Sequence, residues 1–177
     1  MLTLKQVFLN IILLLSLLLL CSGDVIAQTE FKTQDELKLK ADEYFKKEEF
    51  SSAMPLYSQL LSLYPKEQLY NYRFGVCVLS ADRRDPEKPI KYLEYASTQP
   101  GVDISVFYYL GLAYHNNYRF SDAIKQYTIY KEKAKSKLVN EFDVDKQIGI
   151  CNNAKLLLSV VSDLYVLQKT EVAFKDF

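Results

Sequence analysis

Residues 108–127 have the sequence YYLGLAYHNNYRFSDAIKQY, and this stretch decides the fold of the chain. Small and apolar residues recur here at helical spacing on both sides of a polar turn: Leu110, Gly111 and Tyr114 before it, Ala123 and Tyr127 after it. Residues spaced three or four apart share one face of a helix, so the stretch predicts two helices joined by a short turn.

The small residue of the first helix recurs along the whole chain. It stands at Ala41, Gly75, Gly111 and Gly149, at intervals of 34 (75−41), 36 (111−75) and 38 (149−111). A period of this size is typical of a stacked array of helix-turn-helix units. A single unit cannot bury its own apolar face, so each unit has to pack on its neighbours.

The spacing between the two helices of a unit is also regular. Ala123 follows Gly111 by twelve residues (123−111), and the first unit repeats this spacing. Because helices approach closely only where side chains are small, we predict that they cross at these small pairs. In the second unit Pro89 follows Gly75 by fourteen residues (89−75), which predicts a two-residue insertion in the turn at 81–86.

These residues resemble the tetratricopeptide repeat, whose pattern places Leu-Gly, Tyr, Ala, an aromatic residue and Pro at the same offsets. The resemblance implies an all-α fold, a helical solenoid of about three helix pairs with a capping helix. We assign a repeat domain to 28–159, with repeats at about 33–65, 66–100 and 103–137 and the capping helix at 143–159.

The last residues, 160–177, have the sequence VVSDLYVLQKTEVAFKDF. They are rich in β-branched and aromatic residues, and Leu164 and Val166, and then Val172 and Phe174, stand at alternating positions. This pattern predicts one or two strands at the start of a further, C-terminal domain.

The N-terminus has the features of a secretory signal peptide at 1–27. Lys5 precedes an apolar run at 11–20, and Val25 and Ala27 occupy the positions expected before cleavage at Gln28. The apolar stretch is shorter than the ~20 residues that cross a bilayer, although an uncut membrane anchor remains an alternative. Lipidation of Cys21 is a further alternative.

The sequence contains no set of residues that predicts catalysis. His115 is the single histidine among 177 residues, and no Cys, His and Asp cluster has the spacing of a metal site. We therefore predict neither an enzyme nor a bound cofactor or metal. The 22 basic and 22 acidic residues balance, so no basic surface predicts nucleic-acid binding. Cys77 and Cys151 occupy equivalent positions two repeats apart, too far for a disulfide, and are predicted to be core residues.

The resemblance implies that the first helix of each pair lines a concave face, where partners bind. We predict that the residues facing it lie three before, or four to five after, each small residue. This set is Lys38, Phe45, Tyr72, Leu79, Tyr108, His115, Asn116, Lys146 and Asn153. Tyrosines suit a peptide-binding surface. Tyr72 and Tyr108 have an equally good alternative, which is packing between neighbouring repeats.

A secretory start, three repeats, a capping helix and then β-structure resemble the N-terminal part of a family of bacterial envelope proteins. In that family the repeats precede a β-propeller-like (PD40) domain and an OmpA-type domain, and members are associated with type IX secretion. The resemblance implies a periplasmic, outer-membrane-associated scaffold that binds a protein or peptide of the cell envelope. The alternative is a cargo- or glycan-binding module of a secretion or transport apparatus.

Overall fold

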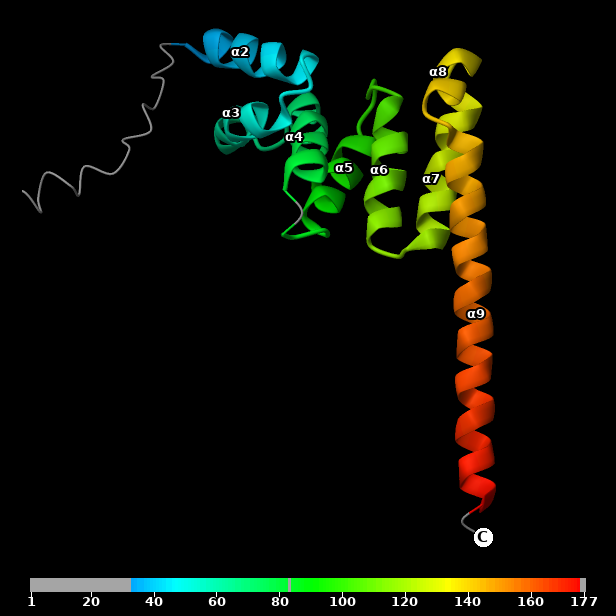
Figure 1. Cartoon of the computed structure of the whole chain (residues 1–177). Coiled ribbons are helices and arrows are strands. Elements are labelled where there is room, and N and C mark those ends of the chain that lie inside the picture. The colour runs from blue at the N-terminus through cyan, green and yellow to red at the C-terminus, as the bar shows by residue number, and fades with distance from the viewer. Residues whose placement is uncertain (1–32, 83, 176–177) are drawn as a thin grey trace, which may run out of the picture. The chain divides into compact units, whose positions relative to one another are not determined.

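The computed structural model describes residues 33–82 and 84–175, with side chains at 33–82 and 84–162. Every regular element in these ranges is a helix (Figure 1). The helices are α2 (Gln34–Lys46), α3 (Phe50–Leu63), α4 (Gln68–Ala81), α5 (Lys88–Ser97), α6 (Ser105–Asn116), α7 (Phe120–Lys133), α8 (Ser136–Glu141) and α9 (Val144–Lys175). The predicted signal peptide, with Cys21 and the Gln28 cleavage site, lies outside the described residues.

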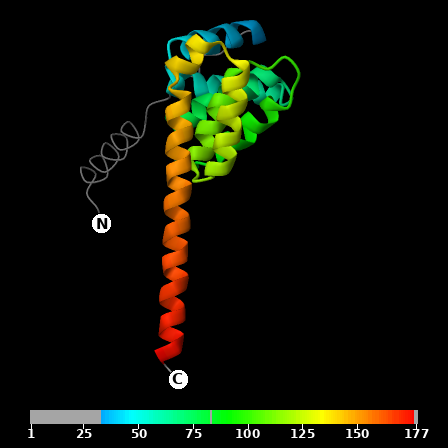
Figure 2. The same ribbon diagram turned by 90° about the vertical axis from the view of Figure 1, so that its right-hand side faces the viewer.

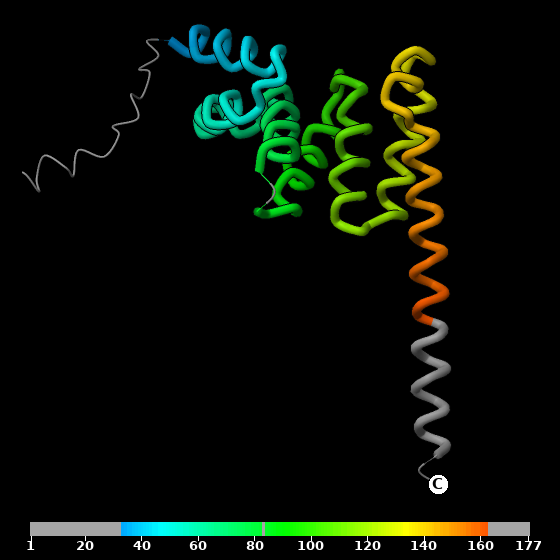
Figure 3. The backbone as a smooth tube through the Cα atoms, in the orientation of Figure 1, coloured from blue at the N-terminus to red at the C-terminus, as the bar shows by residue number. Residues whose placement is uncertain are grey.

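The helices pack in chain order, as the resemblance implies. α2 packs on α3, α3 on α4, and the series continues through α7, which packs on α9 (Figure 3). A continuous apolar core therefore runs from one helix pair to the next. Such nearest-neighbour packing defines a helical solenoid, and the all-α architecture predicted from the repeat period is confirmed for the described residues.

In the second and third units, the glycine of the first helix packs under a bulky residue of the second helix. A Cβ atom added to Gly111 would lie 2.7 Å from the Tyr127 ring, and one added to Gly75 would lie 2.7 Å from Leu93. These bulky residues follow the glycines by 16 (127−111) and 18 (93−75) positions, which reproduces the two-residue insertion. The predicted pairing of the helices is thus correct, but the nearest contact of Gly111 is an aromatic ring and not Ala123.

The insertion lies in the connection between α4 and α5. Asp85 organises this connection, because its Oδ1 accepts hydrogen bonds from the backbone N–H groups of Glu87 and Lys88, both at 3.2 Å. α5 begins at Lys88. The two extra residues therefore lengthen a loop and leave the helices on either side intact.

The first and third units share one turn between their two helices. Glu48 and Tyr118 each have φ of 59°, in the left-handed region that non-glycine residues rarely adopt. The two positions are equivalent, because each precedes the phenylalanine that starts the second helix, Phe50 or Phe120, by two residues. A repeated backbone conformation of this kind shows that the units are structural copies and not only sequence copies.

α9 covers the end of the array and then continues beyond it (Figure 2). Val144 and Cys151 on its first turns are fully buried in the core. Farther along, Leu156 and Leu157 are 64% and 66% exposed. Cys77 and Cys151 are both buried and free, as predicted.

The strands predicted at 160–177 are absent from the described part of this segment, since residues 160–175 belong to α9. The physical reason lies in what the segment lacks. Neither glycine nor proline occurs after Gly149, so nothing in the sequence ends the helix. The β-branched residues have weaker helix propensity, but by only a few tenths of a kcal/mol each.

Candidate functional site

The nine predicted groove residues differ in their exposure. Tyr72 and Tyr108 are buried, with 6% and 9% of their surface exposed. Four of the residues are half-buried, namely Lys38, Phe45, Leu79 and His115. The other three are exposed, namely Asn116, Lys146 and Asn153. The two tyrosines therefore cannot serve as exposed anchors, whereas the remaining seven reach the surface.

The tyrosines belong to the packing between repeats. The Tyr72 ring centre lies 6.4 Å from that of Phe45 on α2 and 6.2 Å from that of Tyr109 on α6. The Tyr108 ring lies 4.3 Å from Phe142, and burial raises the pKa of both tyrosines. Of the two interpretations of these tyrosines, the structure favours packing between repeats.

Three predicted residues meet in one cavity. Leu79 from α4 and His115 and Asn116 from α6 line a cavity of about 480 Å³, which we call the His115 cavity. Its other lining residues are Asp82, Pro86, Pro89 and Tyr118. The cavity thus lies where the C-terminal ends of two first helices meet the lengthened loop between α4 and α5.

One ring nitrogen of His115 lacks a hydrogen-bond partner in the described part of the chain. Its ring packs edge-on against Phe120 at 5.7 Å between centres. Its Nδ1 atom is buried and has no hydrogen-bond partner among the described residues. Burial also lowers the pKa of His115 below its usual 6.5, which favours the neutral ring. A buried polar atom without a partner costs free energy, so the structure holds this ring at some expense of stability.

One wall of the cavity carries an ion pair. Arg84 binds the Asp82 carboxylate, with 2.8 Å between Nε and Oδ1, and its hydrogen bonds lower the pKa of Asp82 to about 2. Leu79, Pro86 and Pro89 supply apolar surface beside it. The arrangement suits an apolar side chain with a polar group at its end, and it contains no nucleophile next to a base.

The residues at the two ends of the predicted groove do not join this cavity. Lys38 lies on α2, while Lys146 and Asn153 lie on α9, and none of the three lines the His115 cavity. Phe45 lies on α2 of the first repeat, and the Arg73 guanidinium from α4 of the second repeat lies 5.3 Å from its ring centre. The sequence therefore predicted a site that extends farther along the array than the cavity does.

Arg73 also links the first two repeats through Asp42. Its guanidinium donates hydrogen bonds to the Asp42 carboxylate and, at 3.0 Å, to the Tyr57 hydroxyl. Tyr57 in turn donates to Asp42 at 2.6 Å. The Asp42 carboxylate is thus bound within the array, which leaves it unsuited to hold a partner.

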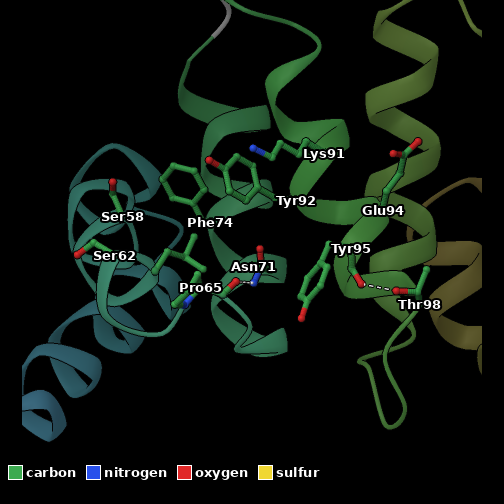
Figure 4. Close-up of a pocket in the computed structure, with 11 residues that line it drawn as sticks. Ser58, Ser62, Pro65, Asn71, Phe74, Lys91, Tyr92, Glu94, Tyr95 and Thr98 are labelled. Carbon is green, nitrogen blue, oxygen red and sulfur yellow. Dashed lines mark hydrogen bonds between the residues drawn. The ribbon is translucent and has the colours of Figure 1, made fainter.

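A second, larger cavity contains none of the nine predicted residues. It has a volume of about 790 Å³ and lies between α3, the start of α4 and α5 (Figure 4). Its walls include Asn71, Phe74, Tyr92 and Tyr95, and we call it the Asn71 cavity. One sequence signal did mark it. Asn71 is the polar residue at a position where the first and third units have Leu37 and Phe107, at offsets of 34 (71−37) and 36 (107−71).

The described residues form neither a metal site nor a membrane span. No group of three or more His, Cys, Asp or Glu side chains in this part of the chain is placed to hold a metal ion. Within the same residues, no helix is both long and apolar enough to cross a bilayer.

Comparison with known proteins identifies the fold. No family model and no curated protein sequence matches the chain. Among solved structures, the chain is similar to the crystal structure of the Sgt2 tetratricopeptide repeat domain from Aspergillus fumigatus, with a TM-score of 0.53 and 18% sequence identity. The match covers 72% of this chain and 82% of that one. The chain therefore has the fold of a tetratricopeptide repeat domain.

Proposed function

We propose that this protein is a protein–protein interaction module that holds a segment of a partner against its first helices, with the His115 cavity as the anchoring point. One observation carries the proposal. The repeat phase predicts that Leu79, His115 and Asn116 face a partner, and these three residues line one cavity. The fold supports it in general terms, because stacked helical repeats offer extended binding surfaces.

We further propose that the protein acts in the periplasm as a scaffold of an envelope assembly. The support is the apolar run at 11–20 with Val25 and Ala27, together with the resemblance to repeat-containing envelope proteins. Mass measurement of protein recovered from the envelope is expected to give a chain that begins at Gln28. Recovery of intact Met1, or of a lipid on Cys21, would contradict cleavage at that site.

The interaction site is tested by filling the cavity from its exposed edge. Asn116→Arg places a long charged side chain at the cavity and removes no buried group, because Asn116 is exposed. Asn140→Arg makes the same chemical change on α8, at an exposed residue that does not line this cavity. Circular dichroism is expected to show the same helicity for both variants and the wild type.

Envelope proteins that co-purify with the wild type are expected to be retained by Asn140→Arg and lost by Asn116→Arg. Equal recovery by the two variants would rule out the His115 cavity as the anchoring point. A fixed set of recovered proteins supports the scaffold. A set that changes with the exported proteins present would support the cargo-binding alternative instead.

A further inference from the structure

The Asn71 cavity lies beside a polar residue at a position where the third unit has a large apolar one. At the equivalent position of the third unit, the Phe107 ring is half-buried, and the Lys133 ammonium lies 5.0 Å from its centre. In the second unit the shorter Asn71 side chain stands there, and the space beside it is open. The second repeat therefore lacks an aromatic side chain that the third repeat supplies for itself.

The orientation of the Asn71 amide is fixed by its surroundings. Its Nδ2 atom donates hydrogen bonds to the carbonyl oxygens of Pro65, at 3.0 Å, and Glu67, at 2.8 Å. Two backbone acceptors on one side of the amide leave no doubt about which atom is nitrogen. Oδ1 therefore points the other way, toward the cavity (Figure 4).

Oδ1 of Asn71 accepts no hydrogen bond from any described residue. The oxygen faces the open cavity, so water or a ligand can reach it. The cavity thus presents one acceptor, held rigidly, to whatever enters it. A ligand with a hydrogen-bond donor at the matching point would satisfy that oxygen.

The walls around this acceptor are aromatic. Phe74 and Tyr92 pack edge to face, with 4.7 Å between their ring centres. Tyr95 is held by its hydroxyl, which donates to the carbonyl oxygen of Lys66 at 3.1 Å. Figure 4 shows Asn71 between the Phe74–Tyr92 pair and Tyr95. Aromatic walls favour a flat ring, because ring pairs gain about 0.5–1.5 kcal/mol beyond the area that they bury.

We propose that the Asn71 cavity is a second binding site that takes an aromatic side chain with a hydrogen-bond donor, a tryptophan or a tyrosine, from a segment of a partner protein. The ring takes the place that Phe107 fills in the third unit, and the indole N–H or phenol O–H donates to Asn71 Oδ1. Phenylalanine offers the ring without the donor and binds less tightly. The site is independent of the His115 cavity, with which it shares no lining residue.

A peptide side chain suits this cavity better than a sugar does. The equivalent positions in the neighbouring units are the apolar residues Leu37 and Phe107, so the fold provides space for apolar volume here. The cavity floor, formed by Phe74, is likewise apolar and buried. Ser62, Glu94 and Thr98 also line the cavity and offer oxygen atoms to a ligand, but the apolar floor matches an aromatic ring better than it matches hydroxyls.

The test uses the full chain and a tripeptide probe, Ac-Gly-Trp-Gly-NH₂. The chain contains no tryptophan, so tryptophan emission comes from the probe alone. Ser58→Phe fills the cavity from α3, where Ser58 is exposed. The matched control is Thr128→Phe, at the equivalent exposed position of the third unit (58 + 70).

The probe is expected to bind the wild type and Thr128→Phe equally and to bind Ser58→Phe at least tenfold more weakly. In competition, Ac-Gly-Phe-Gly-NH₂ is expected to bind on the order of fivefold more weakly than the probe, the effect of one hydrogen bond. The proposal is overturned if probe emission stays unchanged up to its solubility limit, or if Ser58→Phe binds as well as the control. If a disaccharide of N-acetylglucosamine displaces the probe and binds more tightly than the probe does, the cavity is assigned to glycans. That result would also overturn the proposal.

Discussion

Gly111 and Gly149 occupy the same position in successive units, yet their surroundings differ completely. A Cβ atom at Gly111 would lie 2.7 Å from the buried Tyr127 ring, whereas one at Gly149 would meet no atom within 4 Å. The difference is the second helix. α7 packs over Gly111, whereas no helix among the described residues follows α9 to cover Gly149, which is only half-buried. Equivalence in sequence therefore becomes equivalence in packing only where the neighbouring helix is present.

Replacing each glycine with leucine is expected to give the largest difference in stability between the two positions. Gly111→Leu drives a bulky side chain into the Tyr127 ring and should lower the free energy of unfolding by roughly 3 kcal/mol. Gly149→Leu adds a side chain to open space and should leave it unchanged or raise it by up to about 1 kcal/mol, because leucine is a better helix former than glycine. Urea denaturation of both variants measures the difference. Equal losses would mean that Gly149 is as closely packed as Gly111.

Two equivalent tyrosines extend the comparison to the second helices. The Tyr57 hydroxyl donates to Asp42 at 2.6 Å, while the Tyr127 hydroxyl is buried and has no partner among the described residues. Tyr57→Phe should lower the free energy of unfolding by about 1–2 kcal/mol, because a hydrogen bond to a carboxylate is lost. Tyr127→Phe removes an unsatisfied group and should leave that free energy unchanged or raise it by about 1 kcal/mol. A loss in Tyr127→Phe as large as in Tyr57→Phe would reveal a partner for the Tyr127 hydroxyl.

A smaller effect is expected from His115, which lies on α6 of the third unit beside the lengthened loop of the second unit. Burial lowers its pKa in the folded state, while the unfolded state keeps the usual value near 6.5. The unfolded chain then binds more protons in this range, so the free energy of unfolding falls as pH drops below about 6.5 toward the lowered pKa. Stability that is present above pH ~6.5 is thus lost on acidification.

His115→Leu should flatten this part of the stability profile and leave the rest unchanged, because the chain has no other histidine. Chemical denaturation at a series of pH values between about 7.5 and 5.5 makes the comparison in the window where a histidine titrates. A profile of equal slope in the variant and the wild type would mean that burial does not perturb His115.

The repeat period predicted most of the fold, because the small residues at 41, 75 and 111 each sit beneath a second helix. It did not predict which side chain covers them, since Ala123 and Tyr127 share a helix face and sequence spacing cannot say which is nearer. The strands predicted at 160–177 came from the β-branched composition of that segment. The segment also lacks glycine and proline, and this lack favours the helix that forms there.

For the candidate sites, the position of residues relative to the small residue of each unit predicted the His115 cavity and missed the Asn71 cavity. Leu79, His115 and Asn116 shared a phase with the small residues, and they do line one cavity. Tyr72 and Tyr108 shared a similar phase but are buried by Tyr109 and Phe142, which come from outside that pattern. Asn71 carried a signal only when aligned with its counterparts in the other units, because a single polar residue in a helix is ordinary.

The pair Gly111→Ala and Gly149→Ala tests the central claim most directly, since each variant adds one methyl group at the same position of a unit. Alanine in place of a helical glycine gains about 0.5–1 kcal/mol where space is free. Gly149→Ala should therefore raise the free energy of unfolding, and Gly111→Ala should lower it, because its new methyl group collides with the buried Tyr127 ring. Opposite signs in urea denaturation are the predicted result, and a gain in stability from both variants would contradict the account.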